Sequence, residues 1–253
     1  KEKLQVEPMK QTTGTLYGIG VGPGDPDLIT LKAVKILNRV DVVFAAASTK
    51  NPHSLALSIA QPHIPEATPV ELLHFPMTRD RSATRRAWEE NARRIVSVLE
   101  SGRDAGFLTL GDSLTYSTFG YLMKHVQAAA PHIDVQTVPG ITSYQAAASR
   151  LNTPLVEGEG SLMIVSGATG GDRLRSLSQK PETVVFLKAY RNLEDICAAI
   201  EESGQYPHCA AVKNCSLPNE EVVMDIEALC RQKPDYWTLI IARQDTDHDP
   251  ASE

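Results

Sequence analysis

The chain has 253 residues, of which 42% are hydrophobic and 22% charged, and its formal net charge is -6. This length is enough to bury one large hydrophobic core or two moderate ones. The acidic balance argues against a general nucleic-acid binder, and no apolar run approaches the ~20 residues that a membrane span needs.

Residues 1–13 are polar and lack the apolar core of a signal peptide. The four cysteines are Cys197, Cys209, Cys215 and Cys230, and their spacing matches no zinc site and no disulfide framework. We therefore expect reduced thiols in a cytoplasmic protein. The histidines are scattered along the chain, so we expect no metal site that belongs to the protein itself.

Short apolar runs alternate with amphipathic runs through the first half of the chain, which predicts alternating strands and helices. Thr30 is placed to cap the first helix, and Gly102 supplies a C-cap after the long amphipathic run at 82–100. Strands are expected at 16–20, 40–46, 70–73, 105–110 and 135–138, and the other helices at 54–60, 82–100, about 119–126 and 143–151.

The periodic pattern pauses at 152–160, which contains one proline and two glycines, and we expect a domain boundary there. Strands follow at 162–165, 183–187, 209–212, 221–224 and 238–242, with helices at 193–202 and near Ala228. Neighbouring strands without an intervening helix indicate an antiparallel component. The fold class is therefore α/β. We expect two α/β domains, at 14–152 with a mostly parallel sheet and at 153–244 with a mixed sheet, flexible tails at 1–13 and 245–253, and an active-site cleft between the domains.

Glycines recur at every second position from Gly18 to Gly24, but the pattern does not fit a dinucleotide fingerprint. Pro23 interrupts it, and a second proline delays the helix. An NAD-dependent dehydrogenase remains an alternative, and it would need an acidic residue at a strand end about 20 residues past the glycines. Asp41 lies near that distance but precedes its strand, which disfavours this alternative.

Three motifs in order resemble the tetrapyrrole methylases, which are class III S-adenosylmethionine methyltransferases. The stretch 16–33 (LYGIGVGPGDPDLITLKA) is similar to the opening motif of that family, and Gly-Asp-Ser at 111–113 stands where the family has Gly-Asp-Pro. Val-Pro-Gly-Ile-Thr-Ser at 138–143 is similar to a third motif. The resemblance covers roughly residues 14–244.

The segments 74–77, 108–112 and 116–118 narrow the resemblance to the branch that methylates carbon 20 of an early tetrapyrrole in cobalamin biosynthesis. Within that branch, Gly-Asp-Ser at 111–113 resembles the enzyme that acts on a cobalt-loaded substrate, cobalt-factor II, more than the aerobic enzyme that acts on metal-free precorrin-2, which remains an alternative. Another ring methylase of the same family and a non-catalytic cofactor-binding module remain alternatives. The family also implies a homodimer.

The resemblance implies S-adenosyl-L-methionine as cofactor, with S-adenosyl-L-homocysteine as product, and it implies where both would bind. The cofactor residues would be Pro23, Gly24, Gly111, Asp112, Ser113, Thr115, Tyr116, Thr142, Ser143, Leu187, Lys188, Ala189, Lys213, Asn214, Trp237 and Thr238. From the residues alone, Asp112 is also a candidate turn or cap residue, and Thr142 and Ser143 are candidate helix N-caps.

A tetrapyrrole substrate carries several carboxylates, which arginine binds with two-pronged geometry. The candidates are His74, Arg79, Arg81 and Arg191, which follow predicted strands. The arginines within 85–94 stand four residues from glutamates, so we interpret them as a solvated, charge-paired helix face. The sequence identifies no catalytic base.

Overall fold

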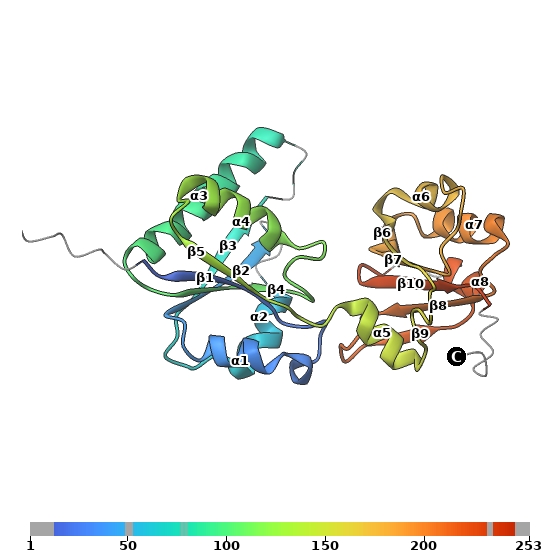
Figure 1. Cartoon of the computed structure of the whole chain (residues 1–253), viewed down its shortest axis with the longest axis horizontal. Helices are drawn as coiled ribbons and strands as arrows, with labels where there is room; N and C mark the ends of the chain where they lie inside the picture. Colours follow the sequence, from blue (N-terminus) through green and yellow to red (C-terminus); the bar gives the residue numbers. More distant parts are fainter. Residues whose placement is uncertain (1–12, 49–52, 77, 79, 232–234, 246–253) are drawn as a thin grey trace, which may run out of the picture. The chain divides into compact units, whose positions relative to one another are not determined.

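The computed structural model describes residues 13–48, 53–76, 78, 80–231 and 235–245, which form two compact units (Figure 1). The units are Lys1–Ile141 and Thr142–Glu253. Each is an α/β structure with its own five-stranded sheet, which confirms the predicted fold class. The expected tails at 1–13 and 245–253 lie almost entirely outside the described residues.

The first unit contains a fully parallel sheet whose strands alternate with helices. The strands are β1 (Thr15–Gly20), β2 (Val42–Ser48), β3 (Val70–Phe75), β4 (Ala105–Thr109) and β5 (Asp134–Val138). Their order across the sheet is β3-β2-β4-β1-β5, so β4 lies between β1 and β2. All five residues of β4 are buried, as expected for a central strand covered on both faces.

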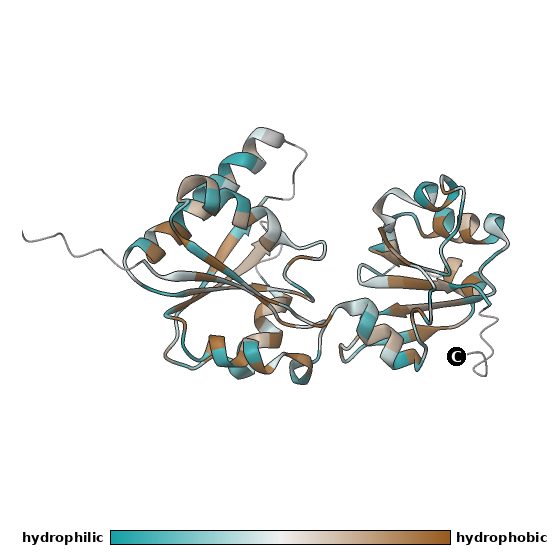
Figure 2. Ribbon diagram, viewed as in Figure 1, coloured by the Kyte–Doolittle hydropathy of each residue, from teal (hydrophilic) through white to brown (hydrophobic). Residues whose placement is uncertain are grey.

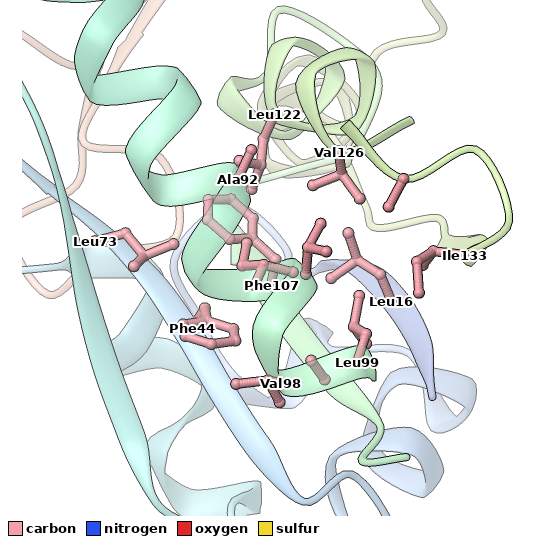
Figure 3. Packing of buried hydrophobic residues seen from close by; sticks show 14 of the residues in the cluster. Leu16, Phe44, Leu73, Ala92, Val98, Leu99, Phe107, Leu122, Val126 and Ile133 are labelled. Atoms are coloured by element: carbon pink, nitrogen blue, oxygen red, sulfur yellow. The ribbon is translucent and has the colours of Figure 1, made fainter. Parts of the chain in front are cut away.

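Helices cover both faces of this sheet (Figure 1). They are α1 (Leu31–Leu37), α2 (Leu55–Ala60), α3 (Arg81–Glu100) and α4 (Thr118–Ala129), with 3-10 turns η1 (Pro26–Leu28) and η2 (Gln61–His63). Helices α3 and α4 pack on one face, where Phe107 is at the centre of the cluster in Figure 3. Helices α1 and α2 pack on the other face around Ile19 and Leu108. Thr30 caps α1 as predicted, accepting a hydrogen bond from the Ala33 amide at 3.2 Å.

The second unit contains a mixed sheet in the order β6-β7-β10-β8-β9. Only the β6–β7 pair is parallel, and the other pairs are antiparallel. The strands are β6 (Leu162–Ser166), β7 (Thr183–Leu187), β8 (His208–Lys213), β9 (Glu221–Val223) and β10 (Thr238–Arg243). The helices are α5 (Ser143–Leu151), α6 (Asp172–Arg175), α7 (Leu193–Ser203) and α8 (Ile226–Cys230), with 3-10 turns η3 (Gly167–Thr169) and η4 (Ala189–Arg191).

Helix α5 belongs to the second unit, so the units divide at Ile141 and Thr142 and not within the pause at 152–160 that the sequence suggested. The reason is the apolar face of α5, where Ala147 is fully buried in a cluster with strand residues Val185 and Val212. Helices α6, α7 and α8 cover the opposite face of the sheet. In both units the hydrophobic colour of Figure 2 is concentrated on the strands and on the helix sides facing them.

The expectation of reduced thiols is wrong for one pair of cysteines. Cys197 in α7 and Cys230 at the end of α8 form a disulfide, with their Cα atoms 6.6 Å apart. Both side chains pack in the cluster under α7, so packing brings together residues that are distant in the sequence. Cys209 and Cys215 are free, and burial raises the pKa of each thiol to about 11. Within the described ranges, no helix is both long and apolar enough to cross a membrane.

Candidate functional site

In the first unit, the glycine that ends β1 packs against the glycines that follow β4 and β5. A Cβ atom added to Gly140 would lie 2.2 Å from the carbonyl oxygen of Gly111, and one added to Gly20 would lie 2.6 Å from the amide nitrogen of Gly140. Such separations are shorter than van der Waals contact, so only glycine fits at these two positions. We call Gly20, Gly111 and Gly140 the glycine junction.

Backbone hydrogen bonds fix the junction. The Gly22 and Gly111 amides each donate to the other residue's carbonyl, at 3.2 and 2.7 Å, and the Val21 amide donates to the Thr109 carbonyl at 2.9 Å. The loop after β1 is therefore hydrogen-bonded to the end of β4 and to the loop that follows it. It does not form the glycine-rich turn of a dinucleotide-binding motif. Pro23 and Gly24, the predicted cofactor residues of this loop, are both buried.

Asp112 joins two of these loops through its carboxylate. Its Oδ1 accepts hydrogen bonds from the amides of Leu114 at 2.9 Å and Thr115 at 3.1 Å, and from the Thr115 hydroxyl. Its Oδ2 accepts one from the Gly140 amide at 3.2 Å. The turn-residue interpretation of Asp112 is therefore correct, and its carboxylate also holds the loop after β5.

Ser113 has a structural role in this unit that proline could not perform. Its side chain is fully buried, and its hydroxyl lies 3.0 Å from the carbonyl oxygens of both Gly18 and Val138. These carbonyls belong to the neighbouring strands β1 and β5, so one hydroxyl proton is shared between them. The departure from the Gly-Asp-Pro pattern thus ties the Gly-Asp-Ser loop to the sheet.

In the second unit, the predicted cofactor residues gather at one end of the sheet. Leu187 ends β7, Lys213 ends β8, and Thr238 begins β10. Thr238 pairs with Lys213 across the β8–β10 ladder, and antiparallel pairing places the end of β7 beside the same end of β10. Ala189 is fully buried in η4, where it also contacts the loop after β6.

Asp235 organises this end of the sheet, and the sequence reasoning missed it. Its carboxylate accepts hydrogen bonds from the Asn214 side chain at 3.1 Å and the Trp237 amide at 3.0 Å, and its carbonyl accepts one from the Thr238 hydroxyl at 2.8 Å. The Asn214 amide also donates to the Trp237 carbonyl at 3.1 Å. An aspartate shortly before an apolar strand is a recognisable turn signal.

Several predicted site residues have left-handed backbone conformations. Tyr116, Lys188 and Asn214 have φ angles of 50°, 58° and 51°. Asparagine tolerates this region, whereas tyrosine and lysine adopt it at a cost of order 1 kcal/mol each, which folded proteins concentrate at ligand sites. Asn152 and Ser216, which were not predicted site residues, have the same geometry, so the binding roles of Tyr116, Lys188 and Asn214 remain predictions.

Thr142 and Ser143 are placed by the start of α5 and so belong to the second unit. Thr142 is the N-cap in a capping box with Gln145, whose side chain accepts hydrogen bonds from the Thr142 amide at 3.1 Å and hydroxyl at 2.9 Å. The cap predicted for Thr142 is therefore present. The Ser143 carbonyl accepts a long hydrogen bond from the Cys215 thiol.

A family model of the Tetrapyrrole (Corrin/Porphyrin) Methylases matches residues 15–230. The chain belongs to the tetrapyrrole methylases. It is 32% identical to the cobalt-precorrin-2 C(20)-methyltransferase of Salmonella typhimurium, covering 91% of this chain and 97% of that enzyme. It is 29% identical to the precorrin-2 C(20)-methyltransferase of a Sinorhizobium species, covering 90% and 94%.

A solved structure shares the fold of this tetrapyrrole methylase. The uroporphyrin-III C-methyltransferase of Thermus thermophilus in complex with S-adenosylhomocysteine aligns with a TM-score of 0.65, at 23% identity over 91% of this chain and 92% of that one. The dehydrogenase alternative fails on topology as well. Dinucleotide-binding sheets place the first two strands side by side, whereas β4 separates β1 from β2 here.

The predicted substrate residues of this tetrapyrrole methylase are not all brought together. His74 is exposed, and it alternates along β3 with Leu73 and Phe75, which face α3, so its side chain lies on the other face of the sheet. Arg79 lies outside the described residues, and Arg81 begins α3 without a described side chain. Arg191 is exposed at the end of η4 in the second unit.

The charged face predicted for α3 is present in part. Arg85 pairs with Glu89 at 2.7 Å, as the spacing predicts. Arg94 instead pairs with Glu71 on β3 at 2.6 Å. A long helix that packs on a sheet offers such cross-element partners, which sequence spacing cannot reveal.

Proposed function

We propose that this tetrapyrrole methylase transfers a methyl group from S-adenosyl-L-methionine to carbon 20 of an early, cobalt-loaded tetrapyrrole intermediate of cobalamin biosynthesis. The observation that carries the proposal is the relationship to carbon-20 methyltransferases along nearly the whole length of both chains. The cobalt-loaded substrate is favoured by the Gly-Asp-Ser loop at 111–113, in which Ser113 stands where the family usually has proline.

The residues present fit the cofactor. Asp112 Oδ2 accepts only one hydrogen bond from the described residues, so it retains capacity for an ammonium group or a ribose hydroxyl. The glycine junction brings three loop backbones together without side chains between them, which allows a ligand to approach main-chain donors closely. In the second unit, Lys188 and Asn214 present left-handed backbone at a single sheet end, which suits the adenosine part.

When bound, S-adenosyl-L-methionine supplies an electrophilic methyl group on a sulfonium, which is already a good leaving group. The protein's own contribution is therefore orientation and exclusion of water more than activation. Asp112 and the glycine junction fix the loops that would hold the methionine end. Asp235 fixes Asn214 and Trp237 at the end of the second sheet.

The test is methyl transfer to matched substrates. The purified protein is incubated with S-adenosyl-L-methionine and either cobalt-factor II or metal-free precorrin-2, and the product is analysed by mass spectrometry and NMR. We expect a single added methyl group at carbon 20, formed faster on the cobalt-loaded substrate. Faster turnover of the metal-free substrate would assign the protein to the aerobic route, and cofactor binding without turnover would make it a binding module.

We further propose a homodimer, which the family resemblance supports, in the cytoplasmic location expected from the sequence. Analytical ultracentrifugation at micromolar concentration tests the assembly, with twice the 27.6 kDa chain mass as the expected result. Cell fractionation tests the location.

A further inference from the structure

Three aromatic rings cluster at the end of the second sheet. Tyr190 lies in η4 after β7, and Tyr236 and Trp237 lie immediately before β10. The ring centroids of Tyr190 and Tyr236 are 4.7 Å apart, and those of Tyr236 and Trp237 are also 4.7 Å apart, in an edge-to-face arrangement. Because β7 and β10 are adjacent in the sheet, residues far apart in the sequence form one continuous surface.

This surface is open to solvent, and the core does not require it. Tyr236 is 48% exposed and Trp237 is 42% exposed. None of the three rings belongs to the hydrophobic clusters described on either face of the second sheet. Large rings exposed side by side are uncommon on a protein surface unless they contact a ligand or a partner.

Arg191 adds a positive charge to the same surface. Its Nε donates a hydrogen bond to the Tyr190 hydroxyl at 2.8 Å, and its guanidinium lies 5.5 Å from the centroid of the Tyr190 ring. Among the residues that the structure describes, no carboxylate forms an ion pair with Arg191. Tyr190 therefore orients the guanidinium and leaves its two terminal nitrogens to bind an anion.

We infer that Tyr190, Tyr236, Trp237 and Arg191 form the surface of the second unit that binds the tetrapyrrole substrate. The rings pack against the flat apolar macrocycle, Arg191 binds one of its peripheral carboxylates, and Tyr190 is a positioning residue for Arg191. A carboxylated macrocycle matches both features, whereas adenine offers no negative charge to Arg191. The inference rests on the proposed function, and it adds Tyr190 and Tyr236 to Arg191. It assigns the exposed ring of Trp237 to the substrate, whereas the Trp237 main chain, which bonds to Asp235 and Asn214, stays with the cofactor residues.

Two binding measurements on the full-length protein test it. Uroporphyrin, a stable polycarboxylated porphyrin, is the macrocycle probe, and S-adenosyl-L-homocysteine is the cofactor probe. The variants are Tyr236→Leu, which keeps an apolar side chain but removes the ring, Arg191→Gln, and Tyr190→Phe, which removes the hydroxyl alone. Arg150→Gln is the control, because Arg150 is an exposed arginine of the same unit that pairs with Glu220 at 2.6 Å.

We expect Arg191→Gln and Tyr236→Leu each to weaken uroporphyrin binding about tenfold, and Tyr190→Phe about threefold, with the control unchanged. The affinity for S-adenosyl-L-homocysteine should stay within about twofold of the wild-type value in every variant, which also shows that the variants are folded. Arg191→Lys should bind uroporphyrin more tightly than Arg191→Gln but less tightly than the wild type, because lysine keeps the positive charge but lacks the two-pronged geometry of the guanidinium. In turnover assays, Arg191→Gln, Tyr236→Leu and Tyr190→Phe should have a higher KM for the tetrapyrrole than the wild type and nearly the same kcat.

Two results overturn the inference while leaving the proposed function intact. In the first, the wild-type protein transfers methyl groups, but either the variants bind uroporphyrin as tightly as the wild type or the wild type does not bind uroporphyrin at all. The other is a loss of S-adenosyl-L-homocysteine affinity equal to the loss for uroporphyrin, which would assign the surface to adenosine. A wild-type protein that neither binds S-adenosyl-L-homocysteine nor transfers methyl groups would instead contradict the proposed function.

Discussion

The two units stabilise their candidate binding loops by different means. In the first unit the loops pack directly on one another at Gly20, Gly111 and Gly140, and the Asp112 carboxylate adds a hydrogen bond between two of them. In the second unit the corresponding sheet end depends on a side chain, Asp235, which binds Asn214 and the Trp237 amide. We therefore expect added atoms to disturb the first arrangement most, and removal of the Asp235 carboxylate to disturb the second most.

This contrast follows from the two sheet topologies. A fully parallel sheet delivers the ends of its strands to one edge, so neighbouring loops crowd together and glycine is required. A mixed sheet places strand starts beside strand ends, and the chain there makes tight turns that need a polar side chain. The chain has two tryptophans, Trp88 in the first unit and Trp237 in the second, so fluorescence can follow each unit separately.

The largest effect is expected for Gly140→Ala. The added Cβ would lie 2.2 Å from the Gly111 carbonyl oxygen, so the backbone of the junction must move. We expect the unfolding free energy of the first unit to fall by about 3 kcal/mol and cofactor binding to be lost. Urea unfolding followed by Trp88 fluorescence in a Trp237→Phe background measures this change.

Gly120→Ala is the matched control, because a Cβ at Gly120 on helix α4 would meet nothing within 4 Å. It should stabilise the same unit by about 0.5–1 kcal/mol, since alanine favours a helix more than glycine does. If Gly140→Ala were equally harmless, close packing of the junction would not hold.

Reduction of the disulfide should affect the second unit alone. Cys197 and Cys230 are 33 residues apart in the sequence, and a bond closing such a loop stabilises a fold by about 2–4 kcal/mol. Dithiothreitol should therefore lower the unfolding free energy reported by Trp237 and leave the value reported by Trp88 unchanged. A Cys197→Ser, Cys230→Ser double variant should not respond. Four free thiols titrated in denatured, unreduced protein would contradict the bond.

Asp235→Ala should have an intermediate effect. It removes the acceptor of two hydrogen bonds and leaves Asn214 unsatisfied, which costs about 1–3 kcal/mol. Binding of S-adenosyl-L-homocysteine should weaken about tenfold.

Asp225→Ala provides the comparison, because Asp225 caps α8 through the Ala228 amide and takes no part in the candidate site. It should cost about 1 kcal/mol of stability and leave binding unchanged. Equal losses of binding in the two variants would show that Asp235 acts only through general stability.

The smallest effect concerns acid stability. The Gly171 amide, and then Arg175, hold the pKa of the Asp195 carboxyl below its usual range. A carboxyl whose pKa is lowered by folding stabilises the protein above about pH 4, and this contribution is lost as the pH falls further. Because the Asp195 side chain is 47% exposed, water screens the interaction and the effect is small.

Asp195→Asn should therefore have a slightly lower melting temperature than the wild type near neutral pH. Below about pH 4 its melting temperature should fall slightly less steeply with pH. Asp172→Asn is the control, since Asp172 is 87% exposed and lies 3.5 Å from the same arginine. Identical acid profiles for the wild type and Asp195→Asn would contradict the assigned cause.

The alternating apolar pattern predicted both sheets and nearly all helices, because strand and helix periodicities are local properties. The boundary was placed too late, since whether α5 packs on its own unit or the next depends on Ala147 meeting Val185 and Val212. The disulfide was missed for a similar reason. The cysteine spacing carries no signal, and only the packing of α7 against α8 joins Cys197 to Cys230.

Motifs indicated many candidate site residues but not how they are held. Asp112 was predicted as a turn residue, yet its contact with Gly140 depends on the neighbouring positions of β4 and β5 on either side of β1. Tyr190 and Tyr236 gave no pattern in the sequence, because β7 and β10 bring them together. The predicted roles of His74, Arg79 and Arg81 remain predictions.

Calorimetric titration with S-adenosyl-L-homocysteine, with NAD as the control, distinguishes a methyltransferase cofactor site from a dinucleotide site. We expect one site per chain with micromolar or tighter affinity for S-adenosyl-L-homocysteine, no heat with NAD, and loss of binding in Gly140→Ala but not in Gly120→Ala. Absence of binding by the folded wild-type protein, or a preference for NAD, would contradict this expectation.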